Sequence, residues 1–165
     1  MLKKEKIKFM EDKKIYLTKE SLEQYNKRLV YLQQEARPLV IEEIKEARNQ
    51  GDLSENAEYD AARDKQAAIE NEILEIQHIL ENAILIDEDF SDSNIVRIGS
   101  TVKLLDLKTK EILTVIIVGA LDADPFNGKI SNSSPLAKAI LNHKVDDTVE
   151  VDAPKKYKVR IESIM

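Results

Sequence analysis

The most constraining feature of the sequence is an apolar repeat in its first half. Hydrophobic residues recur at alternating intervals of three and four, at Leu22, Tyr25, Leu29, Leu32, Ala36 and Leu39. This spacing is the seam of a coiled coil, which places one narrow apolar stripe along a helix. The pattern therefore predicts a long helix packed against another helix. Thr18 precedes the repeat and is suited to cap its start.

The repeat changes phase near Pro38. After this residue the apolar positions move to Val40, Ile44 and Ala47. Proline removes one amide donor, and its ring clashes with the preceding helical turn. We therefore expect a kink or a short break at Arg37–Pro38, which the shifted stripe absorbs as a stutter.

A second apolar stripe predicts the partner helix. Its members are Ile69, Ile73, Ile76, Leu80 and Ala83. Between the stripes, Gly51 is a good helix terminator, and Asp52 with Glu55 resembles a capping box. Two helices of about 30 residues joined by this turn would form an antiparallel hairpin roughly 45 Å long, at 1.5 Å per residue.

The second half of the chain predicts a small sheet. From Ile84 onward, β-branched stretches are separated by turn residues, at 95–98, 101–105, 111–118, 148–151 and 157–161. Ser134 as a cap and Pro135 in the first turn predict one helix. The expected class is α+β: a coiled-coil hairpin at 15–86 and a mostly antiparallel sheet with one helix at 87–165, preceded by a lysine-rich extension at 1–14.

Composition excludes several functions. The chain has 165 residues and no Cys, which rules out disulfide scaffolds, thiol catalysis and Cys-ligated metals. Its net charge of −6 argues against a general nucleic-acid binder. The region 18–84 is the acidic part, with 15 acids and 8 bases. No apolar run reaches the roughly 20 residues of a membrane span, and no signal peptide is evident, so we expect a cytoplasmic protein without a membrane partner.

Acidic residues gather around the predicted turn, at Asp52, Glu55, Glu58, Asp60 and Asp64. Asp52 and Glu55 are three residues apart and would share one face of a first helical turn. Two carboxylates suit part of a Mg²⁺ shell, with the remaining ligands supplied from elsewhere. Alternatively, they only stabilise the helix N-terminus, by roughly 0.3–1 kcal/mol. Spacing alone favours this capping hypothesis.

Two arginines, Arg48 and Arg63, flank the turn, one on each helix. They could contact a phosphate backbone, or they could form ordinary surface ion pairs with Glu55, Asp60 or their neighbours. From the residues alone the ion pair is favoured. Tyr59 could stack on a base or pack across the hairpin.

The tip segment carries a resemblance to a known family. Residues 51–63, GDLSENAEYDAAR, are similar to the tip signature of the bacterial Gre transcript-cleavage factors of the GreA type. Arg37-Pro38, residues 44–48 and the later string DPFNGKISNSSPLA at 124–137 also fit. The likeness covers about residues 14–165 in order, so the extension lies outside the family core.

This resemblance implies a transcription elongation factor that is not itself an enzyme. The globular domain, resembling the FKBP fold, would dock on bacterial RNA polymerase through the region around 122–134. The hairpin would enter the secondary channel of a backtracked complex. There Asp52 and Glu55 would match the family's catalytic acids, which hold Mg²⁺ jointly with the polymerase during cleavage of the nascent RNA near its 3′ end. Arg63, with Arg48, would contact that RNA end, and the factor would act as a monomer.

Three alternative hypotheses are open. A related class of the same architecture blocks the polymerase channel without promoting cleavage. A peptidyl-prolyl isomerase would need an aromatic-lined pocket, and residues 89–165 offer only Phe90, Phe126 and Tyr157. A coiled-coil adaptor would give the tip acids no special role.

Overall fold

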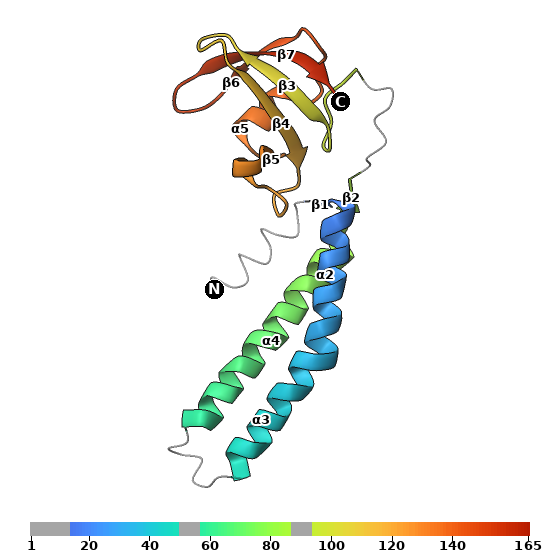
Figure 1. Cartoon of the computed structure of the whole chain (residues 1–165), viewed down its shortest axis with the longest axis vertical. Helices are drawn as coiled ribbons and strands as arrows, with labels where there is room; N and C mark the ends of the chain where they lie inside the picture. Colours follow the sequence, from blue (N-terminus) through green and yellow to red (C-terminus); the bar gives the residue numbers. More distant parts are fainter. Residues whose placement is uncertain (1–13, 50–56, 87–93) are drawn as a thin grey trace. The chain divides into compact units, whose positions relative to one another are not determined.

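The computed structural model describes residues 14–49, 57–86 and 94–165 (Figure 1). The chain forms two compact units. One is the hairpin Glu20–Asn82, and the other combines Met1–Lys19 with Ala83–Met165. The predicted boundaries, 15–86 and 87–165, place residues 15–19 and 83–86 with the hairpin, whereas the structure groups them with the other unit. No helix in the described ranges is both long and apolar enough to cross a membrane.

The hairpin consists of two long antiparallel arms. The first arm is continuous and contains α2 (Lys19–Tyr31), the π-helical turn η1 (Leu32–Ala36) and α3 (Arg37–Asn49). The second arm is the single helix α4 (Ala57–Asn82). Side chains from both arms form a narrow apolar core of Leu32, Val40, Ile69, Ile73 and Ile76. The predicted helical hairpin is therefore confirmed.

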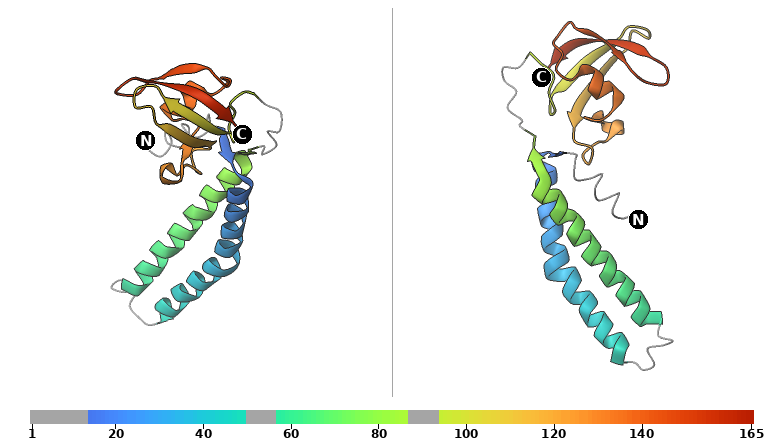
Figure 2. Two further views of the ribbon diagram at one scale, coloured as in Figure 1. Left: turned by 45° about the horizontal axis from the view of Figure 1, so that its top comes forward. Right: turned by 180° about the vertical axis from the view of Figure 1, so that it is seen from behind.

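The predicted phase shift is also confirmed, with two corrections. Val40 is fully buried, whereas Leu39, which the first repeat included, is 62% exposed. Of the kink or short break expected at Arg37–Pro38, no break occurs, because the arm stays helical through a wide turn in the preceding five residues. The arm bends at this turn, as a kink would require (Figure 2). Pro38 has no amide hydrogen to donate, so a wider turn just before it lets the chain stay helical. Ala83, placed in the second stripe, lies in a strand.

Among the described residues, three ion pairs join the two arms: Arg28–Glu72 at 2.7 Å, Arg37–Glu70 at 2.6 Å and Lys65–Glu43 at 2.6 Å. Glu72 and Glu70 each accept from the Nε and Nη2 atoms of their arginine. These hydrogen bonds lower the pKa of Glu70 and of Glu72 below the usual glutamate range. Paired forks of this kind fix geometry, which helps set the register of the arms.

The other unit holds a small mixed sheet and a short ribbon. In the ribbon, β1 (Ile15–Leu17) pairs in parallel with β2 (Ala83–Leu85). The sheet has the order β5-β4-β3-β7-β6. Its strands are β3 (Thr101–Asp106), β4 (Ile112–Val118), β5 (Lys129–Ser131), β6 (Thr148–Val151) and β7 (Tyr157–Ile164). The α+β class is confirmed.

The prediction of a mostly antiparallel sheet needs one correction. β4 and β5 are parallel, because the chain crosses over between them through the short helix η2 (Pro125–Asn127). Residues 95–98 do not form a strand, and Ile95 makes only an isolated bridge to Lys144. Helix α5 (Pro135–Ile140) is present as predicted, and the Ser134 hydroxyl accepts from the Ala137 amide at 3.2 Å.

Helix α5 covers one face of the sheet (Figure 2). Alternate residues of the central strands point into the core between the sheet and α5. They include Val102, Leu104, Val159 and Ile161, which are all fully buried. The intervening Lys103, Lys158 and Arg160 are exposed. This alternation is typical of a sheet with one covered face and one wet face.

The ribbon strand β1 packs closely on the loop that follows β4. A Cβ atom on Gly119 would lie 1.8 Å from the Tyr16 carbonyl oxygen, so only glycine fits. Nearby, the Thr18 amide donates to the Asp122 carboxylate at 2.8 Å. Thr18 directly precedes α2, so this carboxylate accepts a donor at the helix start.

Candidate functional site

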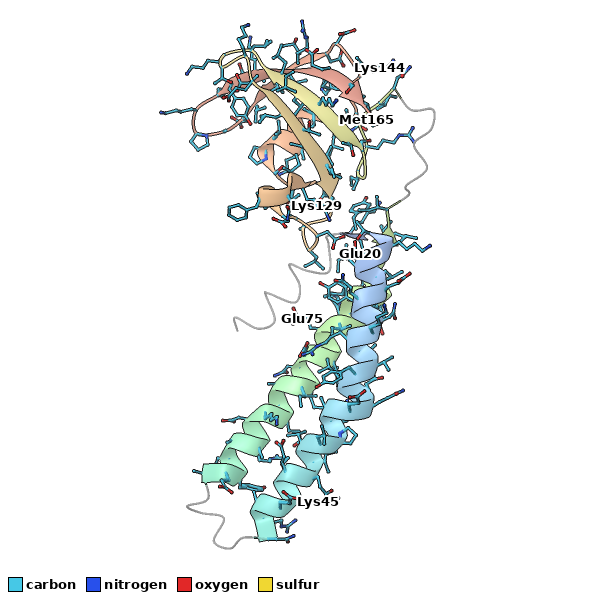
Figure 3. All side chains as sticks on the ribbon, viewed as in Figure 1. Glu20, Lys45, Glu75, Lys129, Lys144 and Met165 are labelled. Carbon is cyan, nitrogen blue, oxygen red and sulfur yellow. The ribbon has the colours of Figure 1, made fainter. Side chains whose placement is uncertain are left out.

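The candidate site is the end of the hairpin where α3 and α4 approach their connection. Arg48 lies in the last turn of α3, and Arg63 lies in the second turn of α4; both are exposed. Figure 3 labels Lys45 close to this end. Asp52 and Glu55 lie outside the described residues. Their predicted role is therefore a hypothesis, and so is the predicted capping of α4 by Asp52.

The ends of the two helices carry charges that suit their dipoles. Glu58 and Asp60 lie in the first turn of α4, and Arg48 lies in the last turn of α3. Acids near an N-terminus and cations near a C-terminus are each stabilising. This local effect is sufficient to explain Glu58 and Asp60 without any further role.

The basic side chains of the distal hairpin divide into two groups. Arg37, Lys45 and Lys65 each form an ion pair with a glutamate. Arg48 and Arg63 form no ion pair with any residue in 14–49 or 57–86, and Arg63 donates instead to the neutral Gln66 amide at 2.9 Å. The predicted ion pair of Arg63 with Asp60 is therefore absent, while Glu55 lies outside the described residues. Among the described residues, no carboxylate neutralises either arginine.

An open groove lies between α3 and α4 on the way to the turn. Ala47, Ala61 and Ala62 form its floor, and Glu43, Glu46, Glu58 and Lys65 surround it. Lys65 is already bound by Glu43 at 2.6 Å. The groove is thus acidic, which favours Arg48 and Arg63 over the groove as the contact for a phosphate. Tyr59 is half-buried, so its ring is only partly available for stacking.

The chemistry of the two tip acids fits Mg²⁺. Carboxylate oxygens are the ligands that this ion prefers, and it commonly takes only one or two of them from a protein. Within the described ranges, no group of three or more potential ligands gathers. Two carboxylates alone do not complete the ligand shell of this ion, so Asp52 and Glu55 would hold it only with further ligands from elsewhere.

A second exposed feature is the turn at Asp124–Gly128 in the sheet unit. Phe126 is 99% exposed at its apex. The Asp124 carboxylate holds this turn by accepting from the Phe126 amide at 3.2 Å and from the Asn127 side chain at 2.6 Å. Gly128 ends the turn with φ +72°, which favours glycine. Aromatic residues, Phe included, are enriched in the buried centres of protein–protein interfaces.

The sequence predicted a docking role for the region around 122–134, whereas Phe126 itself was considered only for an isomerase pocket. The signal was present, because Asp-Pro and Asn-Gly on either side predict a tight turn with Phe126 at its tip. Its exposure also argues against an isomerase pocket, since a side chain pointing into water lines no cavity.

Comparison with known protein families gives matches across both units. Residues 15–85 match the family described as "Transcription elongation factor, N-terminal". Residues 91–165 match "Transcription elongation factor, GreA/GreB, C-term". The two matches leave only the first residues and a short linker uncovered.

Several relatives are similar over most of their length. "Transcription elongation factor GreA" of Metamycoplasma arthritidis is 63% identical over 151 residues, which is 91% of this chain and 95% of the relative. The protein of the same name from Mycoplasma capricolum is 54% identical over 157 residues, covering 92% and 98% of the two chains.

Two solved structures are also similar. GreA factor homolog 1 (Gfh1) of Thermus thermophilus is 28% identical with a TM-score of 0.42, covering 93% of this chain and 99% of that one. A GreA/GreB factor from Nitrosomonas europaea is 21% identical with a TM-score of 0.40, covering 92% and 99%. At these TM-scores the likeness says nothing about the chemistry of this chain.

Proposed function

Because the chain belongs to the GreA/GreB family and is a transcription elongation factor, we propose that it promotes cleavage of nascent RNA by backtracked bacterial RNA polymerase. In this proposal the factor acts in the cytoplasm. The polymerase performs the hydrolysis, and the factor contributes side chains to the polymerase active site. The relatives' names do not favour the isomerase or adaptor hypotheses.

The hairpin is suited to reach a recessed catalytic centre. The 26 residues of α4 span about 39 Å at 1.5 Å per residue. The buried apolar cluster lies in the seam between the arms, and the outward faces of both helices are largely exposed. We propose that the hairpin enters the secondary channel and that the segment joining α3 to α4 reaches the polymerase active site.

Asp52 and Glu55 are the proposed catalytic residues. Mg²⁺ held between these acids and the polymerase would activate a water and stabilise charge on the cleaved phosphodiester. The acids themselves would accept protons or hydrogen bonds from the attacking water and orient it toward the phosphate. Two carboxylates do not make a complete Mg²⁺ site, so the action of these acids would require further ligands from the polymerase.

Arg48 and Arg63 are the proposed contacts for the extruded RNA 3′ end. The observation that supports this role is their lack of any carboxylate partner among the described residues, whereas Arg37, Lys45 and Lys65 each have one. A guanidinium not yet paired can donate two parallel hydrogen bonds to a phosphate. The region around Phe126 is the proposed docking surface for the polymerase.

The proposal is tested by transcript cleavage on a stalled, backtracked elongation complex. Asp52→Asn and Glu55→Gln should each abolish stimulated cleavage while the factor still binds polymerase. Asp60→Asn is the matched control, because Asp60 is an exposed acid of α4 with no proposed role. This variant should stimulate cleavage as well as the unaltered factor. Undiminished cleavage by both tip variants would overturn the mechanism. Binding without cleavage by the unaltered chain would favour the inhibitory alternative.

A further inference from the structure

The π turn η1 (Leu32–Ala36) is the one irregularity within the described first arm. At its end the Arg37 amide donates to the Leu32 carbonyl, five residues back, where an α-helix would use the carbonyl four residues back. The arm bends at this position, where blue passes into cyan in the left view of Figure 2. A π turn of this kind holds one residue more than a regular helical turn.

The extra residue explains why two repeats of different phase can share one seam. The first repeat, continued without interruption, would place Leu39, Glu43 and Glu46 against α4. With one residue absorbed in the turn, Val40 takes the place of Leu39 and is fully buried. Ile44 and Ala47 follow it on the same face, while Glu43 and Glu46 move to the rim of the groove.

The same phase determines which side of the hairpin Arg48 occupies. The Arg37–Glu70 pair marks one lateral side, because it joins the arms there. Arg48 is eleven residues after Arg37, and Arg63 is seven before Glu70. Both intervals are close to whole turns at 3.6 residues per turn, so both arginines lie on the side of this ion pair. The Lys65–Glu43 pair marks the opposite side.

We propose that the π turn, held in place by the Arg37–Glu70 ion pair, positions Arg48 on the same side of the hairpin as Arg63. If Leu32–Ala36 formed a regular α-helical segment with the same number of residues, Arg48 would be rotated by about 100° away from that side. Arg37 acts through this geometry, so it is a positioning residue and not a contact for RNA. Only the benefit of the arrangement for RNA binding rests on the proposed function.

The test measures geometry in the free protein, so it does not depend on polymerase. The chain has no Cys, so Arg48→Cys with Arg63→Cys gives two unique sites for spin labels. A distance distribution with a single narrow peak is expected. Deletion of Gln34, an exposed residue of the turn, should close the turn to a regular helix and leave that peak and the helical content unchanged.

Deletion of Glu42 is the matched control, because it removes one exposed residue of α3 after the turn. It should rotate the labelled position, displace the peak and lower the melting temperature. Arg37→Ala should broaden the peak, and the exchange Arg37→Glu with Glu70→Arg should restore it. Equal effects of the two deletions, or an unchanged peak in Arg37→Ala, would overturn the proposal. If the geometry holds but cleavage does not depend on Arg48, only the proposed RNA contact fails.

Discussion

The hairpin and the sheet unit bury apolar surface in different ways. The sheet unit encloses its core between α5 and the inner face of five strands, and the centre of that core is fully buried. The hairpin has one seam between two arms, whose buried cluster is flanked by partly exposed side chains such as Tyr25 and Ile44. Ion pairs supplement the seam. The comparison indicates that packing fixes the sheet, whereas register and charge contribute more to the hairpin.

The largest expected effect is a core truncation in the sheet unit. Ile161→Ala removes a fully buried side chain from β7, and should lower the free energy of unfolding by about 2–5 kcal/mol. Ile73→Ala in the hairpin seam should fall at the low end of this range, because two helices can move together to fill the gap. Hydrogen exchange would assign each loss to its unit.

Leu74→Ala is the control for this pair, since Leu74 is adjacent to Ile73 and 64% exposed. It should leave stability almost unchanged. An equal loss for Ile73→Ala and Ile161→Ala would mean that the hairpin seam is packed as tightly as the sheet core.

The second prediction separates docking from stability. Phe126→Ala should weaken binding to RNA polymerase by roughly 30-fold, the effect of losing a hot-spot side chain worth about 2 kcal/mol. The melting temperature should not change, because Phe126 is 99% exposed. Ile112→Ala, a truncation of another exposed apolar residue of the same unit, is the control and should bind normally. Unchanged polymerase affinity in Phe126→Ala would remove this residue from the docking surface.

The sequence predicted the hairpin better than the sheet for a physical reason. The apolar repeat of a helical seam extends over many residues, so its period can be recognised in the sequence even though it changes phase near Pro38. The strands are short, and β5 has only three residues, too few for a pattern of alternation. Its parallel pairing depends on where the chain crosses over, which no local pattern records.

The misplaced residues show the same limit. Leu39 fits the first repeat and Val40 fits the shifted one, so spacing predicted a change of phase, but it did not predict that a π turn before Arg37 would produce the change and leave Leu39 exposed. At the candidate site, sequence spacing predicted that Arg48 and Arg63 lie at the hairpin end. It could not predict whether they form ion pairs, because that depends on which carboxylates the neighbouring helical turns place within reach.

The third prediction concerns the two groups of distal cations. Arg63→Ala should reduce crosslinking to the RNA 3′ end about tenfold, since one charge-assisted hydrogen bond is worth about 1.5 kcal/mol. Lys65→Ala should have little effect on crosslinking, because Glu43 already engages that side chain. The Arg63 effect should shrink at high salt, as screening weakens phosphate contacts. Equal crosslinking by both variants would contradict the division of the cations.

The smallest expected effect is a pH dependence of the hairpin's stability. The pKa values of Glu70 and Glu72 are lowered in the folded state by hydrogen bonds from Arg37 and Arg28. The stability they contribute is therefore fully present above the unfolded glutamate value of 4.5 and is lost as the pH falls through the lowered values. Thermal melts from pH 6 to pH 3 should show the unaltered chain losing more stability than Glu70→Gln with Glu72→Gln. Glu75→Gln on the same helix has no ion pair within the described ranges and should follow the unaltered chain. Parallel pH curves for all three proteins would show that the ion pairs fix register without contributing to stability.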